Sequence, residues 1–174
     1  MSGQQTEKTT LGQTLAAELK HEATATRKML ERVPADKFEW SPHDKSMSLG
    51  RLATHVAEVP QWVSPTVTQE ELDFGKSDYK PANLNTPNEL IEAFDKGLNE
   101  ALDALQNVSD EDLMQTWTLR NGEEIILAMP RAAVLRSMVL NHLIHHRGQL
   151  SVYLRLQDVS LPGVYGPTAD EQTM

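Results

Sequence analysis

Apolar residues recur every three or four positions in four long stretches of the chain, a period typical of amphipathic helices. The four stretches are residues 10–33, 49–59, 87–107 and about 130–157. Residues 35–47 and 64–85 lack this period, which indicates loops. The first contains Pro42, and the second collects Gly75, Pro81 and Asn83 in a long crossover loop with room for a short helical turn. Four helices of this length, joined partly by long crossover connections, predict an all-α protein with the architecture of a four-helix bundle.

Proline and capping residues define where these helices begin and end. Pro34 should end the first helix, because proline disfavours helical geometry in the residue before it. Either Ser46 or Ser48 can cap the second helix by accepting a hydrogen bond from a free backbone N–H, and Pro60 should kink or end that helix. Thr86-Pro87-Asn88-Glu89 begins the third helix with a threonine cap, a proline at the first position and a glutamate three residues after the cap.

A short non-helical segment is expected before the last helix. Ser109-Asp110-Glu111-Asp112 is a second capping box, followed by only a short helical turn. Two short runs in residues 116–127 then flank Asn121-Gly122, the commonest signal of a type I′ hairpin turn. Pro130 suits the first position of the helix that follows. We therefore expect a small hairpin beside the helices.

Length and composition restrict the domain organisation and the chemistry. The chain of 174 residues suits a single domain, here residues 10–174, after a flexible polar tail at residues 1–9. The chain has no cysteine, which excludes disulfides, thiolate metal sites and a cysteine nucleophile and fits a reducing cytoplasm. Any bound metal must therefore be held by nitrogen and oxygen ligands.

Charge and hydropathy restrict the partners. A formal net charge of −9 repels nucleic acid and anionic membrane, so neither is expected as the main partner. No apolar run approaches the roughly 20 residues needed to cross a bilayer. The polar N-terminus lacks the apolar core of a signal peptide. The expected location is the cytoplasm.

The last helix carries three of the six histidines within five residues, at His142, His145 and His146. His142 and His146 are four residues apart, so they share one helix face and can bind one metal ion together. The glutamate of the HExxH class is absent, because Leu143 occupies its position. The competing interpretation is a half-buried histidine pair satisfied by neighbouring side chains. His145 lies about 100° round the helix and is expected at a surface or interface.

The surroundings of the pair favour the metal. The histidines lie on a stripe with helical spacing, which we expect to face the core: Leu135, Met138, Val139, His142, His146, Gln149 and Tyr153. Buried imidazoles need partners, and a metal ion is one such partner. Gly148 should allow another backbone to approach closely, next to the site or at a subunit interface.

A third ligand is expected from the second helix, where His55 occupies a face otherwise taken by apolar residues. A lone histidine there is more often a satisfied core residue, but here an inward pair already needs a third donor. Three imidazoles would leave one position on the metal open, which is typical of catalytic sites. By spacing, Glu58, Gln149 and Tyr153 are candidates to orient the imidazoles. Affinity for the metal should fall as pH drops through about 6.5.

One further match to a metal motif is weaker. Glu18 and His21 on the first helix have the Glu-x-x-His spacing of di-iron bundles. Those sites require two such motifs and two further glutamates, and the chain contains one motif. We interpret Glu18 and His21 as exposed polar residues.

Four segments resemble the DinB (damage-inducible) family of metal-binding four-helix bundles: Ser48–His55, Asn141–Leu150, Val152–Arg155 and Val164–Glu171. The resemblance covers nearly the whole chain past the tail. It implies an antiparallel bundle, frequently a homodimer, with a divalent metal on three histidines that map onto His55, His142 and His146. Some relatives are thiol-dependent S-transferases or isomerases, others are described as hydrolases, and many have no established activity.

The leading hypothesis is therefore a metal-dependent enzyme, either a thiol S-transferase acting with a small thiol or a hydrolase. The alternative is a non-catalytic stress-response or binding protein that the metal braces. The sequence leaves open whether the protein turns over a substrate. It also leaves open whether the ion is nickel, zinc, iron or manganese, since all four accept nitrogen donors.

Overall fold

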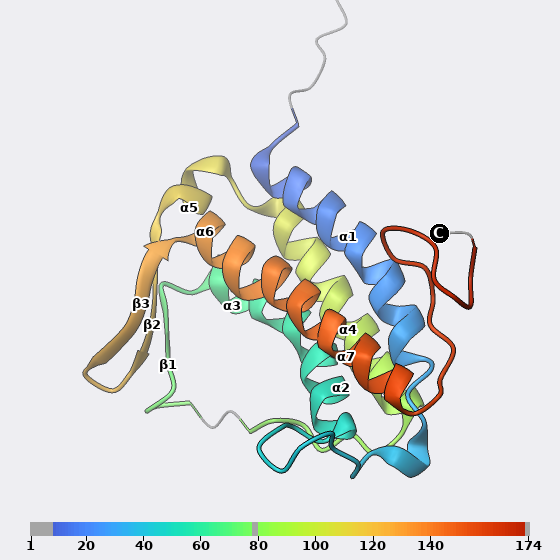
Figure 1. The fold of residues 1–174 in the computed structure, drawn as a ribbon. Coiled ribbons are helices and arrows are strands. Elements are labelled where there is room, and N and C mark those ends of the chain that lie inside the picture. Colours follow the sequence, from blue (N-terminus) through green and yellow to red (C-terminus); the bar gives the residue numbers. More distant parts are fainter. Residues whose placement is uncertain (1–8, 78–79, 173–174) are drawn as a thin grey trace, which may run out of the picture.

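The computed structural model describes residues 9–77 and 80–172 and is mostly helical (Figure 1). Its four long helices are α1 (Leu11–Leu30), α2 (Leu49–Glu58), α4 (Pro87–Asn107) and α7 (His142–Leu156). Helix α1 packs on α4, α4 on α2, α2 on α7, and α7 on α1. This closed ring of contacts surrounds one core, as a bundle requires. The expected all-α class is confirmed, with a small sheet added to it.

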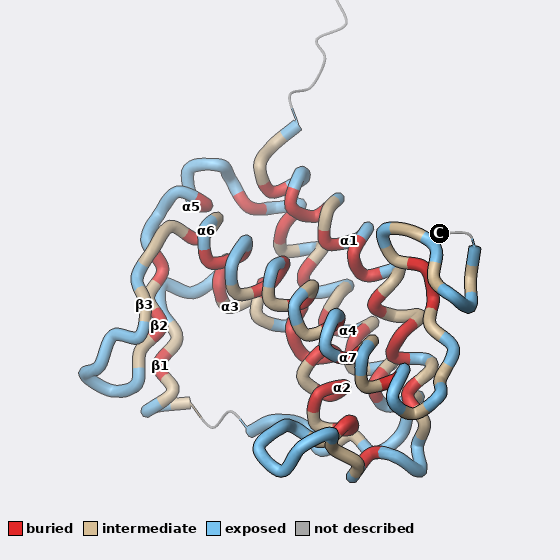
Figure 2. Tube along the Cα trace, viewed as in Figure 1, coloured by how far each residue is buried: buried red, intermediate tan, exposed pale blue. Residues whose placement is uncertain are grey.

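Leucine is the commonest residue in the core that the four helices enclose. Leu19, Leu52, Leu90 and Leu143 each come from a different helix, and each is at most 1% exposed. Figure 2 shows the buried positions on the inward faces and the exposed positions on the outward ones. Burial of one such side chain contributes about 1.5–3 kcal/mol. None of the described helices combines the length and the hydropathy needed to cross a bilayer.

The capping predictions explain most helix boundaries. Thr86 and Glu89 form the expected capping box, and α4 covers the predicted range. Ser48, the second of the two candidate serines, accepts the hydrogen bond from Arg51 N and caps α2. Helix α1 ends three residues before the predicted end, because the chain tightens into turns in which the N–H of Val33 bonds to the carbonyl of Leu30.

Helix α2 ends at Glu58, just before Pro60, as predicted, but the chain stays helical past the proline. A 3₁₀ turn, η2 (Val59–Trp62), follows α2, and a short helix, α3 (Val63–Thr68), follows the turn. Pro60 occupies an early position in η2, where a missing N–H costs little. Residues 64–85, expected to form a long loop with room for a short helical turn, contain most of α3 as that turn. They also contain a strand, β1 (Glu71–Asp73), which was not expected.

The last helical segment runs without a break, as predicted, but it is not α-helical throughout. Helix α6 (Arg131–Val134) leads into a π-helical turn, η3 (Leu135–Asn141), which ends where α7 begins. The wider turn rotates the face that follows it by about one residue. The core stripe of α7 therefore consists of Leu143, Leu150 and Leu154 with Arg147.

This rotation corrects one prediction about α7 and narrows another, that for Gly148, to its subunit-interface alternative. His142 and His146 are half-buried beside the core stripe and do not lie at its centre. Gly148 is exposed, and no heavy atom of the described chain lies within 4 Å of a Cβ added there. The expected close approach of a backbone to Gly148 is therefore absent within the described chain.

The predicted hairpin is confirmed and belongs to a three-stranded sheet. Strands β2 (Thr116–Asn121) and β3 (Glu124–Pro130) are antiparallel, and β1 pairs in parallel with β2. Asn121 pairs with Glu124, so the turn centres on Gly122 and Glu123, and of these two only Gly122 has a positive φ, of 61°. That pattern fits type II′ and corrects the expected type I′. The N–H of Gly122 donates to Asp73 Oδ1 at 2.8 Å, which holds the turn against the end of β1.

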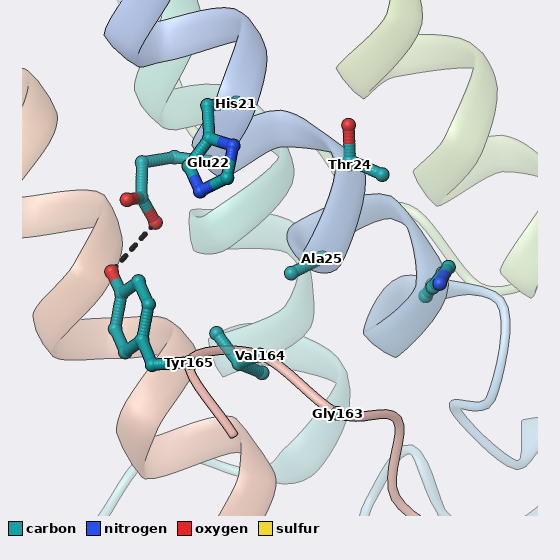
Figure 3. A pocket seen from close by; sticks show the side chains of 8 residues that line it. His21, Glu22, Thr24, Ala25, Gly163, Val164 and Tyr165 are labelled. Atoms are coloured by element: carbon teal, nitrogen blue, oxygen red, sulfur yellow. Dashed lines mark hydrogen bonds between the residues drawn. The ribbon is translucent and has the colours of Figure 1, made fainter. Parts of the chain in front are cut away.

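Two smaller features complete the fold. Helix α5 (Asp110–Met114) is the short turn capped by Ser109, and η1 (Ala35–Lys37) lies in the loop after α1. The segment after α7 folds back against α1, where Tyr165 donates a hydrogen bond to Glu22 Oε2 at 2.7 Å (Figure 3). Glu22 also forms a buried ion pair with Arg147 of α7, at 2.6 Å. A cavity of about 460 Å³ lies beside this contact.

Candidate metal centre

Two helices bring three histidine rings to one point. His55 comes from α2, and His142 and His146 come from the first five residues of α7. The ring centroids of His146 lie 4.5 Å from those of His55 and of His142, and the centroids of His55 and His142 lie 4.9 Å apart. Each ring offers a nitrogen, and these three nitrogens lie within 4.8 Å of one another. The three residues identified from spacing therefore face a common centre between α2 and α7.

The spacing of the nitrogens fits one ion. Two ligand nitrogens at 2.0–2.1 Å from a tetrahedral ion lie about 3.3 Å apart. The observed separations range from 2.7 Å, between His55 Nε2 and His142 Nε2, up to the 4.8 Å limit. The spacing that an ion requires lies within this range. Among the residues that the structure describes, no carboxylate or fourth histidine joins this group.

Burial keeps the three imidazoles neutral at pH 7. Desolvation, followed by the nearby His146, His142 and Arg51, lowers the pKa of His55 from 6.5 to about 4. Desolvation also lowers the pKa of His142 and of His146. Only a neutral imidazole has the lone pair that binds a metal. The site therefore holds its ligands in the protonation state that a metal requires.

Gln149 orients one of these rings. Its Oε1 lies 2.7 Å from His146 Nδ1, one turn further along α7. Since a side-chain carbonyl can only accept, Nδ1 must carry the proton, which leaves the lone pair of Nε2 free to face the other rings. This is the usual second contact of a metal-binding histidine. Of the three residues expected to orient the imidazoles, Gln149 is the one with this direct contact.

Glu58 and Tyr153 have other contacts. The Tyr153 ring packs edge-on against Trp40, with centroids 5.6 Å apart. Glu58 is buried, and its Oε1 accepts a hydrogen bond from Ala82 N at 2.8 Å. Its Oε2 lies 3.6 Å from Arg51 Nη1 in an ion pair. Glu58 is therefore linked to the site only indirectly, through its ion pair with Arg51. Tyr153 instead packs against Trp40 in the loop after α1.

Arg51 is a neighbour of the site that the sequence analysis missed. It lies one turn before His55 on α2, and Glu58 lies about one turn after it, so their ion pair runs along the helix beside the imidazole. The positive charge of Arg51 contributes to the lowered pKa of His55. The i, i+4 spacing of Arg51 and His55 was a usable signal.

The remaining histidines of the sequence analysis lie outside the cluster. His145 is exposed, with its ring centroid 4.8 Å from that of His146, and it is not a member of the three-nitrogen group. His21 is exposed on α1, and Glu18 pairs with Arg136. His21 is therefore exposed, as expected, whereas Glu18 is half-buried in its ion pair with Arg136.

Comparison with known proteins agrees with the fold and identifies the family. The chain matches the family model of the DinB family over residues 1–173. An uncharacterized protein of Bacillus subtilis strain 168, YrdA, is 25% identical over 150 residues, which cover 86% of this chain and 85% of YrdA.

Three solved structures share the fold. A DinB-like protein from Bacillus cereus ATCC 10987 superposes with a TM-score of 0.69 at 24% identity, covering 91% of this chain and all of that one. The DinB-like protein YjoA from Bacillus subtilis gives 0.69 at 18% identity, with 87% and 97% covered. A protein from Exiguobacterium sibiricum 255-15, described as a putative member of the DinB family, gives 0.66 at 20% identity, with 84% and 91% covered. With the family model matching almost the entire sequence, the chain belongs to the DinB family.

Proposed function

We propose that this protein is a divalent-metal-dependent enzyme in which His55, His142 and His146 hold the ion and one coordination position stays open for substrate. The observation that carries the proposal is the convergence of three neutral, half-buried imidazole nitrogens within 4.8 Å. A closed structural site has four protein ligands, whereas a site with three protein ligands leaves room for a reactant.

In this proposal the ion and the protein residues have separate chemical roles. When bound, the ion supplies Lewis acidity, which lowers the pKa of a thiol or a water molecule that takes the open position. The chain supplies the neutral donors, and Gln149 keeps the His146 ring in the required tautomer. A thiol S-transferase and a hydrolase both need this chemistry, and they differ in which reactant takes the open position.

A metal that only braces the fold is the alternative, and one observation favours it. His55 belongs to α2, whereas His142 and His146 belong to α7, so a shared ion would cross-link two packed helices. Bracing predicts a large loss of thermal stability when the ion is removed and no turnover when it is present. Catalysis predicts turnover that disappears with the ion.

The first experiment is elemental analysis of protein purified without a histidine tag. We expect about one equivalent of nickel, zinc, iron or manganese per chain. The loaded protein is then screened with small thiols paired with electrophiles, and separately with activated esters. His142→Ala is the inactive control and His145→Ala the matched active one. Metal binding without turnover in either screen would favour the bracing role, and absence of stoichiometric metal would reject both.

The homodimer implied by the family resemblance is part of the proposal. Gly148 is exposed with open space around it, and Val152 and Leu156 follow it at four-residue intervals on α7. These two apolar side chains are 57% and 56% exposed. A second copy of α7 would cover them and approach closely at Gly148. Sedimentation of wild type and Val152→Glu tests this, since a charge in the interface should shift the dimer toward monomer.

A further inference from the structure

The cavity beside Tyr165, of about 460 Å³, lies between α1 and the segment that follows α7 (Figure 3). Its lining combines the basic side chains of His21 and Lys28 with the apolar side chains of Ala25 and Val164. Sites for small molecules in proteins typically have volumes of roughly 300–1,000 Å³. The cavity is therefore large enough for a small organic ligand.

Tyr165 presents a fixed aromatic surface in this cavity. Its hydroxyl donates a hydrogen bond to Glu22 Oε2 and accepts one from Arg147 Nη2, both at 2.7 Å (Figure 3). The residue is nevertheless 62% exposed, so these two bonds hold the ring in place without covering it. A side chain that is already fixed loses little entropy when a ligand packs against it. The exposed ring therefore favours a flat apolar group as its partner.

Lys28 supplies an uncompensated positive charge. It lines the cavity, is half-buried, and forms neither a hydrogen bond nor an ion pair within the described residues. Its Nζ is not one of the buried polar atoms without a partner, so a ligand in the cavity can reach it. The nearby carboxylates of Glu22 and Glu171 are already paired, with Arg147 and Arg32. The hydrogen bond from Arg32 is the largest cause of the lowered pKa of Glu171, and the charge of Lys28 is the smallest.

The spacing between the ring and the charge limits the shape of the ligand. Glu22, which binds the Tyr165 hydroxyl, precedes Lys28 by six residues, or about 9 Å along the helix axis. One molecule can therefore reach both the ring and Nζ only if a short spacer separates its two ends. A single free lysine balances one negative charge. A carboxylate meets this condition better than a phosphate monoester, which carries about 1.5–2 negative charges at pH 7.

We propose that this cavity binds a small aromatic acid, in which one flat ring is joined by a short spacer to a carboxylate. The ring packs against Tyr165, the spacer lies along Ala25 and Val164, and the carboxylate meets Lys28 Nζ. The site is separate from the metal centre, because none of its lining residues belongs to the three-histidine group.

Fluorine NMR with two matched probes tests the ligand class in metal-free protein. 3-(4-Fluorophenyl)propanoate carries the acid, and 3-(4-fluorophenyl)propanamide is its neutral counterpart. Wild type should bind the acid about fivefold more tightly than the amide, because only the acid pairs with Lys28. Lys28→Gln should remove this preference and leave the affinity for the amide unchanged. Lys20→Gln removes the same charge at an exposed position of α1 outside this cavity and should keep the preference.

A larger side chain at Ala25 tests where the probes bind. Ala25→Leu fills part of the cavity and should weaken both probes about tenfold or more. Ala17→Leu makes the same change at an exposed position of α1 outside the cavity and should leave both affinities unchanged. Intermolecular NOEs from the probe to the Tyr165 ring and the Val164 methyl groups locate the acid in wild type, so this measurement decides the place even if Ala25→Leu misfolds.

The ligand class and the place can each be overturned. Wild type that binds neither probe, or binds the acid and the amide equally, would reject the aromatic acid as ligand. An equal loss of preference in Lys28→Gln and Lys20→Gln would show that net charge, and not Lys28, attracts the acid. NOEs confined to residues outside the cavity, or unchanged binding in folded Ala25→Leu, would reject the cavity as the site.

Discussion

His55 Nε2 lies 2.7 Å from His142 Nε2, although 87 residues separate the two histidines along the chain. At this distance, without an ion, one neutral ring donates a hydrogen bond to the other. The pair thus satisfies its polar atoms in the way that the competing interpretation of the sequence foresaw. The third ring, His146, is what distinguishes the site, because it lies beside both other rings while its Nδ1 binds Gln149, so its Nε2 has no role in that hydrogen bond.

Alanine substitutions separate ligands from neighbours. His55→Ala, His142→Ala and His146→Ala should each abolish stoichiometric metal binding, because two remaining imidazoles do not hold an ion tightly. His145→Ala and His21→Ala should keep it, since both side chains are exposed and outside the three-nitrogen group. Elemental analysis after dialysis measures the outcome. Equal loss in all five variants would contradict the assignment.

Gln149 offers a finer test, because it touches the site only through His146. Gln149→Leu removes the acceptor at Nδ1, so the ring can change tautomer and lose its orientation. Loss of such a second contact typically costs about 10–100-fold in metal affinity. Gln106→Leu, at an exposed position of α4, is the matched control. Competition with a chromophoric chelator measures both affinities, and an unchanged value for Gln149→Leu would remove its orienting role.

Local sequence signals predicted much of this structure. Thr86 and Glu89 fix the start of α4, and the spacing of His142 and His146 required only that the chain be helical there. His55 could be predicted as the third ligand because its face on α2 is otherwise apolar. The centre therefore follows from helix periodicity and from the packing of α2 against α7.

Other features depend on contacts distant in sequence, which periodicity does not reveal. The hairpin turn is centred one residue later than expected, and the N–H of Gly122 in that turn is bound by Asp73 of another strand. The π-helical turn η3 rotated the core stripe of α7 so that Arg147 is buried against Glu22 of α1. Arg147 is charged, so sequence pattern alone would place it at the surface.

The buried pair of Glu22 and Arg147 should be important for stability. Glu22→Ala leaves the guanidinium of Arg147 without its carboxylate partner, in a position where its side chain is only 3% exposed. Removal of one member of a buried pair costs about 3–5 kcal/mol. Glu18→Ala removes the carboxylate of the more exposed pair with Arg136 and should cost about 0–1 kcal/mol. Urea unfolding measures both, and similar losses would contradict this difference.

Acid should destabilise the metal-free protein through the histidine cluster before it acts on carboxylates. The pKa of His55 is about 4 in the folded chain and about 6.5 in the unfolded chain, and the pKa values of His142 and His146 are lowered in the same direction. Between these values the unfolded chain binds protons that the folded chain does not, so protonation favours unfolding. The stabilising contribution is complete above pH 6.5 and is lost as pH falls toward 4.

Urea unfolding of chelator-treated protein between pH 4 and 8 measures this loss. The His55→Gln variant should show a smaller decrease in unfolding free energy over the same interval, because it lacks the histidine whose pKa is lowered to about 4. Metal affinity should decline in the same direction, with its midpoint below the pH 6.5 expected for free imidazole, because protons compete less well for these buried rings. A wild-type profile as flat as that of His55→Gln would show that the cluster does not resist protonation, and the argument for neutral ligands would fail with it.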